Sequence, residues 1–194
     1  MTLKRPAPLD VDLRIERSGG EAALFHGGEQ LAVAEPGSAA FDVPSPPSLE
    51  EAKAAEGRYV GHEHHIYPGC FVCGPEREAG DGWRIFPGEI APGRVAATWI
   101  PAAEFAGADE GVKPEFIWAA LDCPGYFAVQ EAAGLALLGR MGVVLHKPVP
   151  AGKPLIVQAW AMGSDGRKHR AGTAVHDSSG RLLASASQTW ITLR

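Results

Sequence analysis

A single long helical pattern between two groups of short strand patterns is the feature of this sequence that most limits its fold. The helical pattern begins at Pro114, a favoured first helical residue, and apolar residues recur at helical spacing as far as Leu121. We expect Pro124 and Gly125 to kink or interrupt this helix, which then resumes to about Ala133. A few strands, one helix and then a meander of strands is an α+β order.

The other segments are predicted mainly as strands joined by turns, which fits the 24 glycines and 16 prolines of the chain. Ser48 and Glu51 form a capping-box pattern, which predicts a short helix over 49–56. Asp177–Gly180 is predicted to be the turn before the last strand. The predicted strands are 13–16, 22–26, 30–35, 83–86, 94–100, 137–145, 155–162, 170–176 and 181–193.

Composition and charge exclude several classes of protein. The net charge of -5 argues against a nucleic-acid partner or an anionic membrane held by bulk charge. No apolar run is long enough to span a bilayer, and the N-terminus lacks the apolar stretch of a signal peptide. Three cysteines fit a reducing cytoplasm better than a disulfide scaffold. We therefore expect a cytoplasmic protein with neither nucleic acid nor membrane as a partner.

The sequence divides near residue 60. Residues 1–60 are predicted as an N-terminal β-hairpin extension and a proline-rich linker, and residues 61–194 as the main domain. The stretch Ala23–Ala32 is similar to Ala174–Ala184, because both read as hairpins with an alanine after the turn. The N-terminal piece is then a remnant of a second unit or an added hairpin, and chance similarity between hairpins explains the match equally well.

Four segments of the main domain carry a resemblance to a known family. They are Cys70–Glu76, Gly80–Ile85, the strand-turn-strand Arg140–Leu155 and the closing Ala184–Trp190. Together and in this order they resemble the hotdog thioesterase superfamily, in particular its phenylacetate-pathway-like branch. The resemblance implies an antiparallel sheet wrapped around a long central helix, and a homodimer. It also implies an acyl-CoA-like substrate, with no cofactor other than the coenzyme A of that substrate.

The same resemblance implies hydrolysis of an acyl-CoA or related thioester. Asp122 matches the carboxylate that acts as general base or nucleophile in many members. Lys113–Glu115 stands where those members have His-Gly-Gly, and Pro114 has no N–H to donate to an oxyanion. The N–H of Glu115 could replace it, and the Glu115 carboxylate could itself act as a base. Asp122 could also be a structural residue at the end of the helix.

Substrate-binding residues are predicted in two sets. Apolar residues of the helix, Phe116, Trp118 and Phe127, would shape an acyl pocket if the helix lines the substrate tunnel as in hotdog proteins. Basic residues at strand ends and at one hairpin have the chemistry to hold the phosphates of coenzyme A. These basic residues are Arg140, Lys147, Arg167, Lys168 and Arg170.

One loop is rich in residues that can bind zinc: His62, His64, His65, Cys70 and Cys73. Zinc sites usually draw on two separated ligand pairs, so we expect no metal here, with the two cysteines packed as small apolar residues in a turn and one histidine facing the cleft. Cys123, a third thiol, is expected to be a buried small residue.

Two other functions on the same fold are compatible with the sequence. The replaced His-Gly-Gly favours an acyl-CoA or small-molecule binding protein without catalysis. A hydratase or dehydratase would use a histidine with a carboxylate, and His62, His64, His65 and His146 are available.

Overall fold

Antiparallel strands account for most of the fold. The computed structural model describes residues 1–37, 41–107 and 111–193. The strands before the helical region are β1 (Thr2–Leu3), β2 (Arg14–Ser18), β3 (Glu21–His26), β4 (Glu29–Ala34), β5 (Gly88–Ala91) and β6 (Arg94–Trp99). Those after it are β7 (Ala136–Leu145), β8 (Leu155–Asp165), β9 (Lys168–Asp177) and β10 (Leu182–Thr192). They form one ten-stranded sheet in the order β2-β3-β4-β1-β7-β10-β9-β8-β6-β5.

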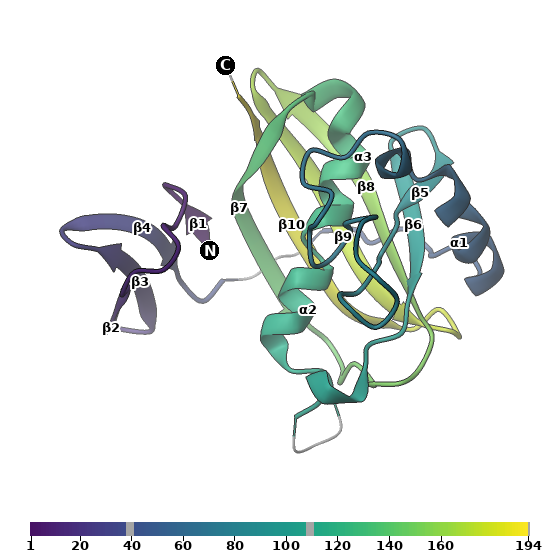
Figure 1. The fold of residues 1–194 in the computed structure, drawn as a ribbon, viewed down its shortest axis with the longest axis horizontal. Coiled ribbons are helices and arrows are strands. Elements are labelled where there is room, and N and C mark those ends of the chain that lie inside the picture. The colour runs from purple at the N-terminus through teal and green to yellow at the C-terminus, as the bar shows by residue number, and fades with distance from the viewer. Residues whose placement is uncertain (38–40, 108–110, 194) are drawn as a thin grey trace.

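Two helices fill the concave side of this sheet. Figure 1 shows the long strands curving around α2 (Pro114–Ala120) and α3 (Cys123–Ala133). Ile117 and Leu121 pack in one core with Val157 and Val175, which are paired across β8 and β9. Burying such side chains contributes about 1.5–3 kcal/mol each. The predicted α+β order and the antiparallel sheet are confirmed.

The predicted long helix is two helices, and the break lies earlier than Pro124 and Gly125. Leu121 and Asp122 lie between them, and Asp122 has φ -74° and ψ -77°. Pro124 lies in the first turn of α3, where its missing N–H breaks no intrahelical hydrogen bond. Gln188 of β10 donates through Nε2 to the carbonyl oxygens of Leu121 at 2.5 Å and Asp122 at 3.0 Å. The side chain of Gln188 thus bonds the Leu121 carbonyl at the helix break and adds a second hydrogen bond to the Asp122 carbonyl, which also accepts the N–H of Gly125 at 3.1 Å.

The convex face of the sheet is covered by α1 (Leu49–Ala55) and by the chain before it. The predicted capping box of Ser48 and Glu51 is present, with both reciprocal hydrogen bonds. Successive strand residues point to opposite faces, so Ile156 packs against α1 while its neighbour Val157 faces α2 and α3. Pro44 accepts a hydrogen bond at 2.7 Å from Gln158, so the proline-rich segment lies on the sheet and is no free linker.

The N-terminal strands form a three-stranded meander, β2-β3-β4, where a hairpin was predicted. β1 pairs with both β4 and β7 and so joins the meander to the main sheet. Figure 1 shows the meander beside β7, on the side of the sheet away from α1. All residues of β2 are exposed.

The segment between α1 and β5 packs over the helices on the side away from the sheet (Figure 1). It includes the short 3-10 helices η1 (Glu56–Arg58) and η2 (Val60–His62); a third, η3 (Ala103–Phe105), follows β6. The prediction of a strand over 83–86 is wrong. These residues make single backbone hydrogen bonds to Phe71 and Val72, and Arg84 has a positive φ of 53°. Their strand pattern reflects burial, because Trp83, Ile85 and Phe86 are core residues.

Residues 108–110, in the connection between β6 and α2, lie outside the described residues. Among the helices of the described residues, none is long and apolar enough to cross a membrane.

Candidate functional site

An apolar cavity of about 550 Å³ opens where the helix break, the segment before β5, the β7–β10 edge and the N-terminus meet. The helix α3 contributes Tyr126 and Phe127, and the two strands contribute Leu138 and Trp190. Residues Leu3–Pro6 close one side. The volume is in the range of small-molecule sites, which are mostly apolar with a few placed polar groups.

Asp122 is the carboxylate of this cavity. Its Oδ1 atom is buried and has no hydrogen-bond partner among the described residues. Burial, and secondly the negative charge of Cys70, raise the pKa of Asp122 to about 7. A carboxylate in apolar surroundings without a hydrogen bond is costly to keep, and such groups occur mainly at functional sites.

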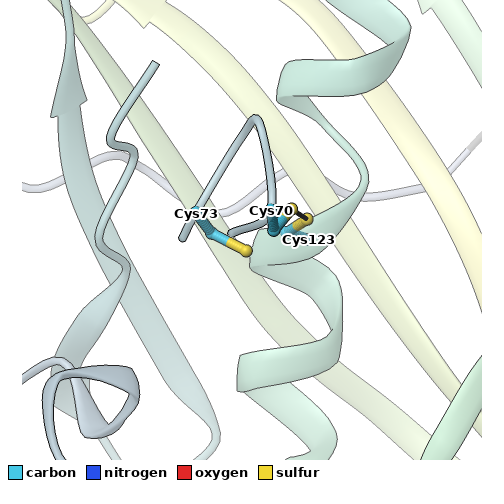
Figure 2. Close-up of side chains that lie close together, drawn as sticks. All are labelled: Cys70, Cys73 and Cys123. Atoms are coloured by element: carbon cyan, nitrogen blue, oxygen red, sulfur yellow. Dashed lines mark hydrogen bonds between the residues drawn. The ribbon is translucent and has the colours of Figure 1, made fainter. Parts of the chain in front are cut away.

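Three cysteines converge beside Asp122. The turn Cys70–Gly74, closed by a 2.8 Å backbone hydrogen bond, carries two of them, and Cys123 begins α3. The Sγ atoms of Cys70 and Cys123 are 3.7 Å apart, and all three Sγ atoms lie within 4.8 Å of one another. Figure 2 shows the thiols of Cys70 and Cys123 side by side, with the thiol of Cys73 nearby. The cysteines pack against the core, as predicted, but their convergence into one cluster was not predicted.

Mutual hydrogen bonding also changes the acidity of these thiols. Hydrogen bonds from the thiols of Cys123 and Cys73 hold the pKa of Cys70 well below its usual range. The pKa of Cys123 is raised, first by its hydrogen bond to Cys70, then by its hydrogen bond to Cys73 and by burial. The cluster thus favours one thiolate on Cys70, held by two thiols.

His65 is the histidine of the loop that reaches the cysteines. Its Nε2 atom lies 3.3 Å from Sγ of Cys73, and its Nδ1 atom accepts the backbone N–H of Tyr67 at 2.9 Å. Burial lowers the pKa of His65. Because Nδ1 accepts a hydrogen bond, the proton of the ring is on Nε2. His64 lines the cavity as an exposed side chain, whereas His62 has its Nε2 3.1 Å from the Glu56 carbonyl oxygen.

The predicted acyl-pocket residues separate in the structure. Phe127 lines the cavity. Phe116 and Trp118 are half-buried in the core, where the Phe116 ring contacts that of Phe105 at 4.7 Å, and neither lines the cavity. Glu115, the second predicted catalytic residue, is exposed in the first turn of α2 and does not line the cavity either.

The predicted phosphate-binding residues lie outside the cavity lining. Arg140 forms an ion pair with Glu35 at 3.5 Å, and Lys147 is exposed after β7. Arg167, Lys168 and Arg170 lie exposed at and beside the turn from β8 to β9. In the described part of the chain, the lysine and arginine side chains that do line the cavity are Lys4 and Arg5, which contact Gln30 and Glu29 of the N-terminal meander.

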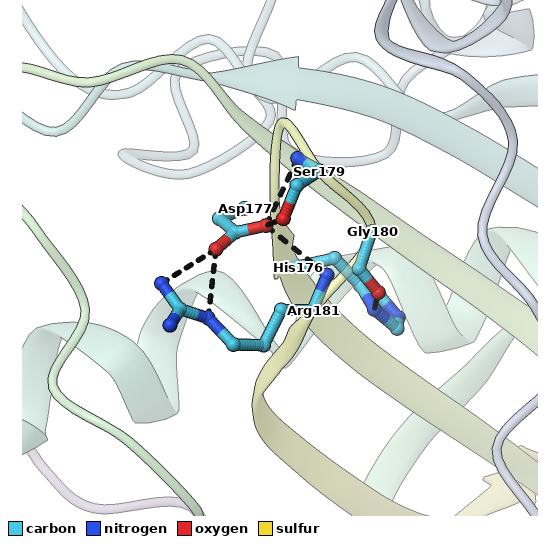
Figure 3. Close-up of polar contacts among 5 residues, drawn as sticks. All are labelled: His176, Asp177, Ser179, Gly180 and Arg181. Atoms are coloured by element: carbon cyan, nitrogen blue, oxygen red, sulfur yellow. Dashed lines mark hydrogen bonds and ion pairs between the residues drawn. The ribbon is translucent and has the colours of Figure 1, made fainter.

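A second polar cluster lies in the predicted turn from β9 to β10 (Figure 3). Asp177 accepts hydrogen bonds from the hydroxyl of Ser179 at 2.6 Å and from Arg181 at 2.9 Å. These bonds, the Ser179 hydroxyl first, lower the pKa of Asp177 to about 2. His176 contacts the carbonyl oxygen of Gly180 and not Ser179, so the cluster is no Ser-His-Asp nucleophile site.

Comparison with known proteins finds similarity in structure only. No family model and no curated protein sequence matches the chain. A thioesterase superfamily protein of known structure is 19% identical with a TM-score of 0.58, over 64% of this chain and 60% of that one. A Streptococcus mutans protein bound to acetyl CoA is 12% identical with a TM-score of 0.53, over 61% of this chain and 94% of that one.

The phenylacetic acid degradation protein PaaI of Thermus thermophilus, in the structure of a point mutant, is 21% identical with a TM-score of 0.49, over 54% of this chain and 90% of that one. This chain thus spans about 60% of the first of the three structures. The predicted resemblance is confirmed at the level of the fold: the chain has the hotdog fold found in thioesterase superfamily proteins.

Proposed function

We propose that this protein hydrolyses an acyl-CoA or related thioester in the cavity beside Asp122. The observation that carries the proposal is the position of Asp122 at the wall of an apolar cavity, where its buried Oδ1 has no hydrogen-bond partner among the described residues. A hotdog structure with acetyl CoA bound supports the substrate class. A fold alone does not assign an activity, so the proposal rests on the site.

In this proposal the acyl group enters the apolar part of the cavity, between Phe127 and Leu138. Asp122 removes a proton from a water molecule that attacks the thioester carbonyl carbon. The carbon–sulfur bond then breaks, the thiol leaves with the proton that Asp122 received, and the acid remains. The positive end of α3, which begins directly after Asp122, favours the developing oxyanion.

Lys4 and Arg5 are proposed to hold the phosphates of coenzyme A. They line the cavity and their side chains are exposed, so the phosphates of a long polar carrier can reach them from solvent while the acyl group stays inside. The roles proposed from the sequence for Glu115 and for the basic hairpin residues have no comparable support, because neither lines the cavity.

We further propose a homodimer. Large apolar side chains are exposed on β7 and on the N-terminal segment beside it, among them Leu137, Leu145 and Ile15. Exposed apolar surface of this kind often marks a protein interface. Light scattering coupled to size-exclusion chromatography would give twice the mass of one chain if the proposal holds, and a single-chain mass would contradict it.

We also propose a reducing compartment such as the cytoplasm, because the three cysteines are free.

The activity is tested by mixing purified protein with short, long and aromatic acyl-CoAs and measuring free thiol and free acid together. The proposal predicts equal release of both for at least one acyl class. Binding of acyl-CoA, seen as a thermal shift, without thiol release would indicate a binding protein instead. A product heavier than an enoyl-CoA by one water, with no free thiol, would indicate a hydratase.

A further inference from the structure

We propose that Cys70, Cys73 and Cys123 bind a thiophilic divalent metal ion, Zn²⁺, at the wall of the cavity. Three thiol groups from two segments far apart in the sequence lie close together, with every Sγ within 4.8 Å of the others (Figure 2). Thiolates are the ligands that zinc prefers among side chains, and they select it over magnesium or calcium. This inference does not depend on thioester hydrolysis.

The distance between two of the sulfur atoms matches that in a metal site. Zinc–sulfur bonds of about 2.3 Å in a tetrahedron place neighbouring sulfur atoms about 3.8 Å apart. The Sγ atoms of Cys70 and Cys123 are 3.7 Å apart. The cysteines are free, so no disulfide competes for the sulfur atoms. The Cys70–Gly74 turn and the start of α3 are both fixed by backbone hydrogen bonds, which hold the ligand positions before any metal binds.

His65 is assigned a supporting position beside the site and is not a ligand of the metal. Its Nδ1 atom accepts the N–H of Tyr67, so the proton of the neutral ring is on Nε2, 3.3 Å from Sγ of Cys73. A protonated nitrogen cannot bind a metal, but it can donate to a thiolate and stabilise its charge. Side chains that donate to metal ligands in this way hold them in place, and their loss commonly weakens metal binding about 10–100-fold.

The fourth position of the metal would face the cavity, because all three cysteines and Asp122 line it. Three protein ligands with one open position is the arrangement of catalytic zinc sites, whereas structural sites have four protein ligands. We therefore expect a water molecule as the fourth ligand, with the Asp122 carboxylate within reach of it. Binding of Zn²⁺ would displace the protons of the thiols, so it also releases protons to the solvent.

The first experiment measures metal in the full chain, purified without a histidine tag under reducing conditions. Elemental analysis should give about one zinc per chain. After removal of the metal, addition of Co²⁺ should produce the intense near-ultraviolet absorption of thiolate–cobalt bonds. No zinc and no such absorption would overturn the proposal. An isolated protein with a Cys70–Cys123 disulfide, lighter by two hydrogen atoms, would overturn it as well.

Substitutions at the proposed ligands test whether the metal binds at these residues. Cys70→Ser and Cys123→Ser should each lose the metal and most of the cobalt absorption, with circular dichroism used to confirm folding. His65→Asn should keep one metal but bind it about 10–100-fold more weakly. His62→Ala is the matched control, since this loop histidine is exposed, does not line the cavity and should not affect metal binding. Unchanged metal content in both serine variants would place the ion elsewhere and contradict the assignment.

Discussion

Asp122 and Asp177 both lie at the ends of elements of the same domain, yet their environments are opposite. Asp177 accepts hydrogen bonds from residues two and four positions later, and these bonds lower its pKa to about 2. Asp122 has an unpartnered buried oxygen and a pKa raised to about 7 by burial. The local turn stabilises its own carboxylate, whereas at the helix break Oδ1 of Asp122 has no hydrogen-bond partner among the described residues.

The two sites also differ in what holds them. The Asp177 turn is fixed by its own residues and by Arg181. The backbone of Asp122 is fixed by Gln188, 66 positions away, which donates to the carbonyl oxygens of Leu121 and Asp122. Asp122 should therefore be sensitive to changes on β10, and Asp177 should not. The predictions below test this difference, from the largest expected effect to the smallest.

Gln188→Leu should have the largest effect on stability. It removes the hydrogen bonds that Gln188 makes to the Leu121 carbonyl oxygen and to the Nε1–H of Trp190, and one of the two that the Asp122 carbonyl oxygen accepts. We expect the free energy of unfolding to fall by about 2–4 kcal/mol. Chemical denaturation measures the change, with the half-buried neighbour Thr189→Ala as control. A change of similar size in both variants would mean that Gln188 has no special role at the break.

Gly125→Ala should disturb the contact between α3 and the side chain of Gln188 from the helix side. A Cβ atom at Gly125 would lie 1.6 Å from Oε1 of Gln188, so the glutamine side chain must move and weaken its bonds. The better helix propensity of alanine offsets part of the cost, and we expect a net loss of about 1–2 kcal/mol. Gly142→Ala, where the nearest atom is 3.6 Å away, is the matched control in thermal unfolding. Equal unfolding temperatures for the two variants would refute the close contact.

Replacing both Lys4 and Arg5 by Ala tests which basic residues hold the carrier. We expect KM for an acyl-CoA to rise about 5-fold, equivalent to about 1 kcal/mol for exposed charged contacts, with kcat unchanged. A thioester without phosphates should show no change in KM. The paired variant Arg167→Ala, Lys168→Ala is expected to keep the wild-type KM. If the hairpin variant alone raises KM, the carrier lies over the β8–β9 turn as the sequence suggested.

Asp177→Asn should have the smallest effect. The lowered pKa of Asp177 means that its carboxylate stabilises the fold above the pKa of an unfolded aspartate, about 3.9, and that this stabilisation is lost as pH falls toward 2. The turn is exposed to solvent, so we expect a loss of less than about 1 kcal/mol at pH 7. Urea unfolding at pH 7 and near pH 2 should show the difference at neutral pH only. A difference that persists near pH 2 would assign it to lost packing.

Local features of the fold could be predicted from the sequence. The capping box of Ser48 and Glu51, the turn at Asp177–Gly180 and the strands after the helices are set by residues close together in the chain. Features that depend on residues far apart in the chain could not be predicted from the sequence. The strand pattern at 83–86 was misread because burial in an aromatic core produces the same residue types as a strand.

The candidate site divides in the same way. Asp122 could be found because a carboxylate at the end of an apolar helix is unusual in any context. The cysteine cluster needed the structure, because Cys123 is 53 residues from Cys70 and nothing in the spacing pairs them. A Cys-x-x-Cys loop with one unassigned cysteine elsewhere was the signal available. Lys4 and Arg5 reach the cavity only because β1 pairs with β7, and such pairing leaves no mark in the sequence.

The most direct test of the account compares thiol release from the preferred acyl-CoA by the wild type, Asp122→Asn and Asp177→Asn under one set of conditions. The account predicts that kcat/KM falls at least about 100-fold in Asp122→Asn, the usual loss on removal of a general base, while the fold persists. Asp177→Asn should release thiol at close to the wild-type rate. Wild-type turnover by Asp122→Asn would contradict the central claim that this buried carboxyl group performs the chemistry.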